Sequence, residues 1–373
     1  DVTLEGSGAV SIGALYAHGA LARQADELTL GSAQSDTGDT GMVVAGTLEV
    51  GALRSGGNWT MQAADARIGT ADVAGDATQT AGTLTQQQLT VGGNWVLDAG
   101  TADIGAADIA LDAGMQADAL TLGTLTVGGN WALDAGTADI GTADVAGNAT
   151  QTADALVQQQ LTVGGNWTLD AGTADIGTAN VTGNATQAAD TLVQQQLTAG
   201  GNWMLDAGVA EVDTADIALN ADMQAGELTL GTLAVGGNWM LDAGTADIGV
   251  ADVVGDATQT TGTLAQQQLT VGGNWILDAG TADIGTADIA FDVGMQADAL
   301  TLGTLAVGGN WMLVAGTADI GTADVAGNAT QVADTLVQQQ LTVGGNWMLD
   351  AGSAGIETAD IALDADLQAD ALT

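Results

Sequence analysis

The chain lacks cysteine, proline and lysine, and it is poor in basic and aromatic residues. Its 373 residues include 3 arginines, 46 acidic residues, nine Trp, one Tyr and one Phe, which gives a formal net charge of −43. Without cysteine, the chain forms neither a disulfide framework nor a thiolate metal site. The charge excludes nucleic acid as a partner and disfavours an anionic membrane surface, because like charges repel.

The scarcity of large side chains argues against a thick globular core. Most apolar residues are small, and no apolar run is long enough to span a membrane, so we expect no membrane insertion. We find no signal peptide. The chain begins at Asp1 and ends at Thr373 within a repeat, so we expect a segment of a longer protein. Acidity of this degree is typical of disorder, but a strict repeat indicates order instead.

Nine tryptophans define that repeat. Each lies in a Gly-Gly-Asn-Trp sequence, 36 residues from the next without an insertion. A constant spacing in this range is typical of a solenoid or an array. The tryptophans are Trp59, Trp95, Trp131, Trp167, Trp203, Trp239, Trp275, Trp311 and Trp347.

Each 36-residue unit consists of two 18-residue halves, which we number from the first glycine of GGNW. Position 3 is Asn or Asp in eighteen successive halves, beginning at Asn58 and including Asn94, Asn130 and Asn166. Apolar residues alternate at positions 4 and 6, 11 and 13, and 16 and 18, which is the period of a β-strand. We therefore interpret each half as one coil.

These patterns predict an all-β, single-stranded β-helix (β-solenoid) with three short strands per 18-residue coil. Coils stacked at the ordinary strand spacing of about 4.8 Å would give some 20 coils a length of roughly 95 Å. Inward side chains then form ladders of like residues, and a thin core suffices. The absence of proline agrees, because interior strands must donate ladder hydrogen bonds.

We expect two segments of one β-helix. Residues 1–55 are degenerate coils in which the apolar pairs recur at steps of 18, 20 and 18, so a two-residue loop insertion is predicted there. Residues 56–373 are the regular coils of the GGNW repeat.

Coils that lack GGNW occur in two types. In one, positions 6 and 13 are both Gln, as in Gln151 and Gln158; in the other they are Met and Leu, as in Met115 and Leu122. Both positions face inward by alternation. We expect the two side chains to touch at one corner of the core, because a mixed pair would leave a polar group unsatisfied at about 1–3 kcal/mol. Duplication of two unit types without any contact is the alternative.

The other repeated residues have a structural and a functional interpretation. We expect Trp to be a core residue, since its neighbour one coil away is Ala; a row of sugar-stacking tryptophans is the alternative. We expect the Asn and Asp of position 3 to form a structural ladder along the axis.

Outward aspartates recur at positions 12 and 17, as in Asp103, Asp108, Asp139 and Asp144. Ca²⁺ takes 6–8 oxygen ligands, whereas equivalent aspartates within a row lie about 9.6 Å apart and the two rows lie on different faces, so we expect only diffuse cation association. Repeated carboxylates also do not make a single active site. His18 lies near Tyr16 without a triad partner, and no phosphate-binding loop is present. We expect no enzyme activity and no cofactor.

The segments Gly92–Gly100 and Gly164–Gly172 (GGNWVLDAG and GGNWTLDAG) resemble the repeats of filamentous-haemagglutinin-like exoproteins. The resemblance covers about residues 56–373, although Trp replaces the usual Leu and the 36-residue step is unusually strict. It implies a right-handed β-helix shaft of a two-partner-secretion adhesin, with an outer-membrane secretion partner. Such proteins lie at the bacterial cell surface or in the biofilm matrix.

We therefore expect the monomeric structural stalk of a secreted adhesin that bridges cells or the extracellular matrix. Alternatives are a face that binds matrix polysaccharide, and the stick of a contact-dependent toxin-delivery exoprotein. Ice binding through regular Thr columns such as Thr137 and Thr173 is opposed by the Asp beside each Thr.

Overall fold

A computed structural model describes all residues, 1–373, in two units, residues 1–183 and 184–373. Every element is a strand, and no helix that could cross a membrane is present. Each unit is a parallel β-solenoid, and the two together make about 21 turns with a repeat of about 18 residues. The boundary expected after residue 55 lies inside the first unit.

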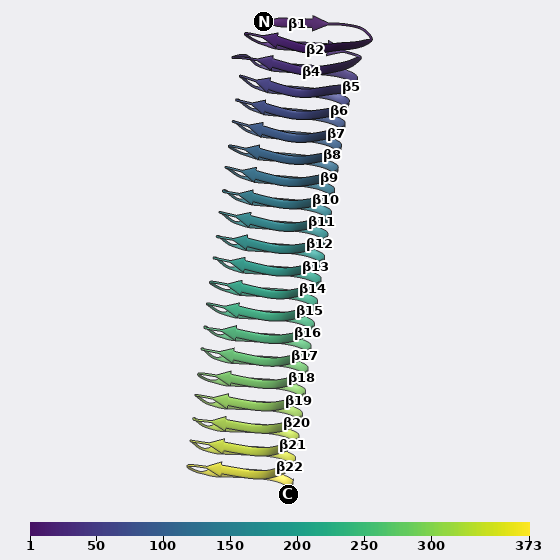
Figure 1. The fold of residues 1–373 in the computed structure, drawn as a ribbon. Coiled ribbons are helices and arrows are strands. Elements are labelled where there is room, and N and C mark those ends of the chain that lie inside the picture. Colours follow the sequence, from purple (N-terminus) through teal and green to yellow (C-terminus); the bar gives the residue numbers. More distant parts are fainter. The chain divides into compact units, whose positions relative to one another are not determined.

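The strands of the first unit become regular from β6 onward. They are β1 (Val2–Glu5), β2 (Ala9–Ala17), β3 (Leu21–Ala25), β4 (Glu27–Ser35), β5 (Thr40–Ser55), β6 (Trp59–Val73), β7 (Ala77–Val91), β8 (Trp95–Ile109), β9 (Ala113–Val127), β10 (Trp131–Val145), β11 (Ala149–Val163) and β12 (Trp167–Val181). Within the unit each strand lies directly beside the strand of the next coil (Figure 1).

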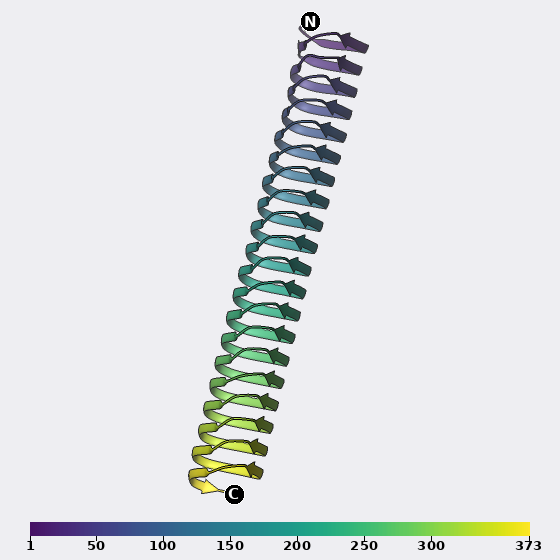
Figure 2. The same ribbon diagram turned by 90° about the vertical axis from the view of Figure 1, so that its left-hand side faces the viewer.

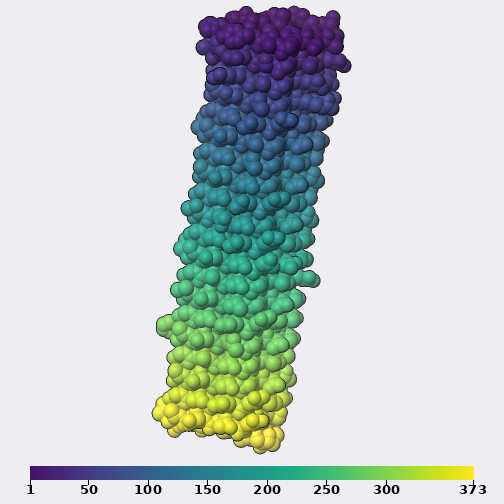
Figure 3. Space-filling model, viewed as in Figure 1, coloured from purple at the N-terminus to yellow at the C-terminus, as the bar shows by residue number.

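The second unit has one strand per coil throughout. Its strands are β13 (Ala185–Ala199), β14 (Trp203–Ile217), β15 (Ala221–Val235), β16 (Trp239–Val253), β17 (Ala257–Val271), β18 (Trp275–Ile289), β19 (Val293–Val307), β20 (Trp311–Val325), β21 (Ala329–Val343), β22 (Trp347–Ile361) and β23 (Ala365–Leu372). Seen from the side, each coil is a flattened turn that runs on into the next coil of its unit (Figure 2). On the visible face, side chains cover both units with shallow relief between coils (Figure 3).

From β6 onward, successive coils within each unit pair in parallel at a constant step of 18 residues. In β10, Trp131 pairs with Ala113 of β9 and with Ala149 of β11, and Leu133 pairs with Met115 and Gln151. The corners between strands follow the same step, because the Gly147 N–H donates to the Gly129 carbonyl at 2.8 Å. Each residue therefore stacks on residues at its own position.

Strand length differs from the sequence-based expectation. We expected three short strands per coil, whereas each regular coil is one strand of 15 residues. The pairing of β10 omits two residues, Gly136 and Gly141, and so has three consecutive segments. The apolar alternation located these segments, but it did not show that the strand geometry continues through the glycines.

The predicted extra residues of the first coils are present at two separate places. Ser35 pairs with Ser55, a step of 20, whereas Thr40 pairs with Trp59, a step of 19. One residue is therefore added in the corner between Ser35 and Thr40, and the other is added where the register shifts between Val44 and Thr47. The expected two-residue loop is two single insertions.

Glycines at the GGNW corners pack closely against the preceding coil. Gly8 alone has a positive φ, so a left-handed backbone does not explain the others. A Cβ added at Gly93 would lie 2.2 Å from Asp76 Oδ1 and 2.9 Å from the backbone of Gly75. At Gly114, on the outer face of β9, an added Cβ meets nothing within 4 Å. A corner glycine thus permits close approach, whereas Leu111, at the same position of the next coil, donates its N–H to the Gly93 carbonyl at a longer 3.3 Å.

Gly93→Ala should therefore destabilise the chain by about 1–3 kcal/mol, because neighbouring coils must separate to admit the methyl group. Gly114→Ala is the matched control and should change stability by no more than about 0.5 kcal/mol. Urea unfolding followed by tryptophan fluorescence compares the two. Equal midpoints for both variants would show that stacking does not require the corner glycine.

Candidate functional site

The tryptophan side chains are buried at 0–3 % exposure and lie in the core. Trp131 is flanked on both sides by alanine, Ala113 and Ala149, which gives its large ring room within a narrow coil. Val293 beside Trp275 is one exception to this pattern. Because the rings are buried, they offer no surface for stacking sugars.

The expected Gln–Gln contact is present in all five coils of that type. Gln151 Nε2 donates to Gln158 Oε1 at 3.0 Å, and Gln158 Nε2 donates to the Gln160 carbonyl at 2.9 Å. Both side chains are fully buried. The corresponding pairs are Gln79 with Gln86, Gln187 with Gln194, Gln259 with Gln266, and Gln331 with Gln338.

Sequence reasoning missed a further bond to this pair. Trp167 Nε1 donates to Gln151 Oε1 at 2.8 Å, from the coil that follows the glutamines. The same bond joins Trp95, Trp203, Trp275 and Trp347 to their preceding glutamines. The Trp167 indole and the amides of Gln151 and Gln158 therefore form a hydrogen-bonded chain across the core, which ends on the Gln160 carbonyl. The other four Gln coils form the same chain.

The remaining four tryptophans follow a coil with Met at position 6. Their indole N–H groups are buried and have no hydrogen-bond partner: these are Trp59, Trp131, Trp239 and Trp311, which follow Met42, Met115, Met223 and Met295. A buried unsatisfied donor costs about 1–3 kcal/mol. Gln coils thus satisfy the next tryptophan, and Met coils do not.

The row of Asn and Asp at position 3 forms a ladder through its side-chain oxygens. Asn130 Oδ1 accepts the backbone N–H of Asn148 at 2.9 Å, and Asp112 Oδ1 accepts that of Asn130 at 2.6 Å. Amide stacking is secondary, as in Asn148 Nδ2 to Asn130 Oδ1 at 3.1 Å. Either residue type supplies the required oxygen, which explains why only these two occur.

Aspartates in this row are never neighbours. Every neighbour of an Asp in the row is Asn, as Asn94 is between Asp76 and Asp112. Asn94 donates to Asp76 through its backbone N–H at 2.7 Å and through Nδ2 at 3.2 Å. The alternation keeps carboxylates two coil spacings apart.

The outward aspartates at positions 12 and 17 are exposed, including Asp103, Asp108, Asp139 and Asp144. No group of three or more His, Cys, Asp or Glu side chains comes close enough to hold a metal ion.

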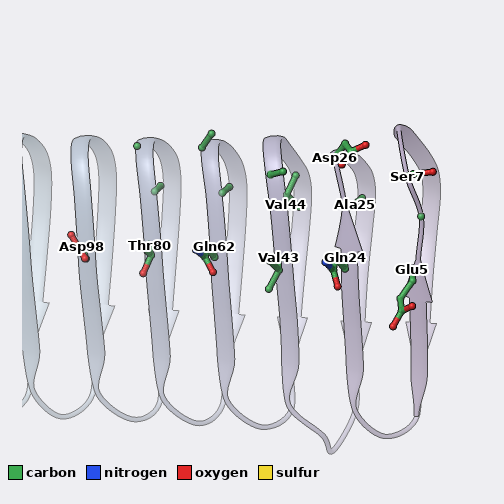
Figure 4. Close-up of a pocket in the computed structure, with 16 residues that line it drawn as sticks. Glu5, Ser7, Gln24, Ala25, Asp26, Val43, Val44, Gln62, Thr80 and Asp98 are labelled. Carbon is green, nitrogen blue, oxygen red and sulfur yellow. The ribbon is translucent and has the colours of Figure 1, made fainter.

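A second acidic feature, at positions 7 and 9, escaped the sequence analysis. Asp98, Asp118 and Asp134 line a shallow pocket whose floor is Ala and Gly. In the first coils, a larger hollow of about 870 Å³ is lined by residues at the same positions of successive coils, which we call columns. Figure 4 shows Glu5, Gln24 and Val43 side by side on successive coils, followed by Gln62, Thr80 and Asp98. The Asp spacing was visible in the sequence, but the concave backbone was not.

One further cluster lies on the surface of the first coils. Tyr16 Oη donates to Asp36, Gln34 Nε2 donates to Asp36 at 2.9 Å, and His18 Nδ1 lies 3.1 Å from it. The Tyr16 hydroxyl and the Gln34 amide lower the pKa of the Asp36 carboxyl, and the same tyrosine bond raises the pKa of Tyr16. His18 thus has a carboxylate partner but no nucleophile.

Comparison with protein-family models, curated proteins and solved structures found no match to this chain.

The hydrogen-bonded core chain predicts a non-additive mutant cycle. Gln151→Met should cost about 2–5 kcal/mol, because Trp167 Nε1 and Gln158 Oε1 both lose their partners. Gln151→Met with Gln158→Leu should cost less than Gln151→Met alone, since only the indole is then unsatisfied. Urea unfolding of Gln151→Met, Gln158→Leu and the double variant, each compared with the parent chain, gives the cycle. Additive costs in the double variant would contradict the contact.

Introducing the Gln pair into a Met coil should satisfy the indole of the next tryptophan. Met115→Gln with Leu122→Gln supplies an acceptor for Trp131 and should be more stable than Met115→Gln alone by about 1–3 kcal/mol. If Met115→Gln by itself proves as stable as the double variant, the indole bond does not need the second amide.

The ladder predicts a charge effect that depends on the neighbours. Asn94→Asp places three carboxylates in adjacent coils, at Asp76, position 94 and Asp112, whereas Asn148→Asp has only Asn neighbours. Both variants lose an Nδ2 bond of about the same length, so they are matched. Asn94→Asp should have the lower Tm in low salt, and the difference should shrink in 1 M NaCl, about ten times a typical 0.1 M buffer, because salt screens exposed charges. Equal Tm values in low salt would contradict this account.

Proposed function

We propose that the chain is part of the structural stalk of a secreted bacterial adhesin. The observation that carries this proposal is the stacking of coils in register within each unit, with the repeated Trp and Gln side chains buried in the core. A solenoid becomes longer with each added coil, because each coil needs only its neighbours for stability. Repeated outward carboxylates keep such a surface soluble and discourage lateral strand pairing.

The proposal includes the finer features that the repeat favours. Each coil has three faces, supported by the two omitted pairings at Gly136 and Gly141, and the coil is right-handed, as the resemblance to filamentous-haemagglutinin-like exoproteins implies. From that resemblance we also propose two-partner secretion, an outer-membrane secretion partner, and a place at the cell surface or in the biofilm matrix. The stalk is monomeric and not an enzyme.

A polysaccharide-binding face is the second candidate. The pocket around Asp98, Asp118 and Asp134 presents carboxylates and the Gln116 amide above an Ala and Gly floor, which suits the hydroxyl groups of a sugar chain. The same columns are hollowed in the second unit, around Asp278 and Asp298.

Binding of the purified 373-residue chain to matrix polysaccharide separates the two candidates. A stalk predicts no saturable binding, and no effect of the triple variant Asp98→Ser, Asp118→Ser and Asp134→Ser. Saturable binding that this variant removes would contradict the stalk and support a binding face. Surface plasmon resonance with immobilised polysaccharide gives the readout, and Asp139→Ser with Asp144→Ser is the control for loss of charge.

A second experiment tests export and adhesion in a Gram-negative strain that displays the protein. Removal of residues 128–163, two whole coils, should keep the protein folded and displayed, because the remaining coils meet in register. A deletion of one and a half coils, residues 128–154, should abolish display. A stalk predicts weaker cell aggregation after the first deletion. Unchanged aggregation with normal display would contradict it.

A further inference from the structure

One outward column differs between the two units. Position 5 lies on the outer face beside the tryptophan, and in the first unit it holds small or polar residues at most GGNW coils, such as Thr60, Ala132 and Thr168. In the second unit every GGNW coil has a large apolar residue there, exposed at 50–55 %: Met204, Met240, Ile276, Met312 and Met348. These side chains are half-exposed to solvent.

Between Ile276 and Met312 this column opens into a groove. Both flank Gly294 in the coil between them, and a Cβ added at Gly294 meets nothing within 4 Å. The resulting hollow has a volume of about 880 Å³ and is also lined by Val314. It is large enough to take an apolar side chain of a partner.

Val314 breaks the charge pattern at the same place. Position 7 is Asp in most GGNW coils, but here it is Val314, 42 % exposed, which pairs directly with exposed Val332 in the next coil. The apolar surface therefore extends from the groove to Val314 and across to Val332 of the next coil. The equivalent site of the first unit, around Gly114, has Ala132 and Asp134 instead of Met312 and Val314.

The rims of the groove are acidic. Asp278 lies exposed on one side, and Asp292 lies on the other, where its Oδ1 accepts two bonds from Asn310. All arginines of the chain, and its histidine, lie in the first unit, so the second unit has no basic residue. A second copy of this surface would meet it with charge of the same sign.

We propose that the groove around Gly294 is a docking surface for a basic, amphipathic, extended peptide segment of a partner protein. An aliphatic side chain of the peptide enters the hollow between Ile276 and Met312. Basic side chains beside it reach Asp278 and Asp292. Apolar contact gives the affinity, and the acidic rims select a cationic partner. A neutral sugar lacks the charge that both rims favour, and the two aromatic residues of the lining, Trp275 and Trp311, are buried at 0–1 % exposure and so offer no face for a sugar ring.

Fluorescence anisotropy with labelled octapeptides tests the proposal on the full chain in 150 mM NaCl, about the physiological ionic strength. The probes are an alternating Leu-Lys peptide and an alternating Ser-Lys peptide of equal charge. We expect the Leu-Lys peptide to bind at least about tenfold more tightly than the Ser-Lys peptide. Equal affinities would overturn the proposal, because binding would then reflect only the negative charge of the protein.

The variant Met312→Ala with Val314→Asp replaces the apolar lining of the groove. It introduces the residue types found at the equivalent site around Gly114 in the first unit, Ala132 and Asp134. Docking predicts that it weakens Leu-Lys binding by about tenfold or more. Diffuse charge attraction predicts the opposite sign, since the variant is more acidic. Met204→Ala, in the same column but outside the groove, is the control and should bind within about twofold of the parent. Unchanged or tighter binding by the double variant, or saturable binding of cellohexaose that displaces the peptide, would overturn the proposal.

Discussion

Registered stacking of 18-residue coils is the constraint on which the other features of each unit depend. Parallel pairing at a constant step brings every side chain beside residues of its own position. The residue at each position must therefore pack against the residues at the same position of the two adjacent coils. Tryptophan is tolerated because alanine lies on both sides in most coils. Aspartate is tolerated in the ladder because asparagine lies on both sides of it.

Polar groups inside the coils follow the same constraint. A buried glutamine such as Gln151 is satisfied by Gln158 within its coil and by Trp167 of the next coil, so a single coil contains an incomplete network. The Met coils avoid buried amides but leave an indole N–H without a partner. The Gln coils thus fill the core beside tryptophan with amides that need the next coil to complete their hydrogen bonds. The Met coils fill it with apolar side chains that leave the indole N–H unsatisfied.

Much of this was predictable from the sequence, for identifiable reasons. The tryptophan spacing gave the 36-residue unit, and the Asn and Asp row divided it into two 18-residue coils. The joint change of Met115 with Leu122 and of Gln151 with Gln158 indicated their contact. The indole bond to Gln151 was not predictable, because Trp occupies position 4 in every GGNW coil and so does not vary with the glutamines. The ladder was expected, but its acceptor role toward backbone N–H groups needed the corner geometry. The pocket near Asp98 and the groove around Gly294 depend on backbone shape, for which the alternation of residues carries no signal.

Disulfide trapping tests registered stacking most directly, since the natural chain has no cysteine. Asp139→Cys with Val157→Cys places thiols at paired, exposed positions of adjacent coils, within the Cα separation of about 4.4–6.8 Å that a disulfide allows. Asp139→Cys with Asp175→Cys separates them by two coils, about 9.6 Å. Stacking in register predicts rapid and complete oxidation of the first pair and none of the second. Comparable oxidation of both pairs, or of the second alone, would contradict the account.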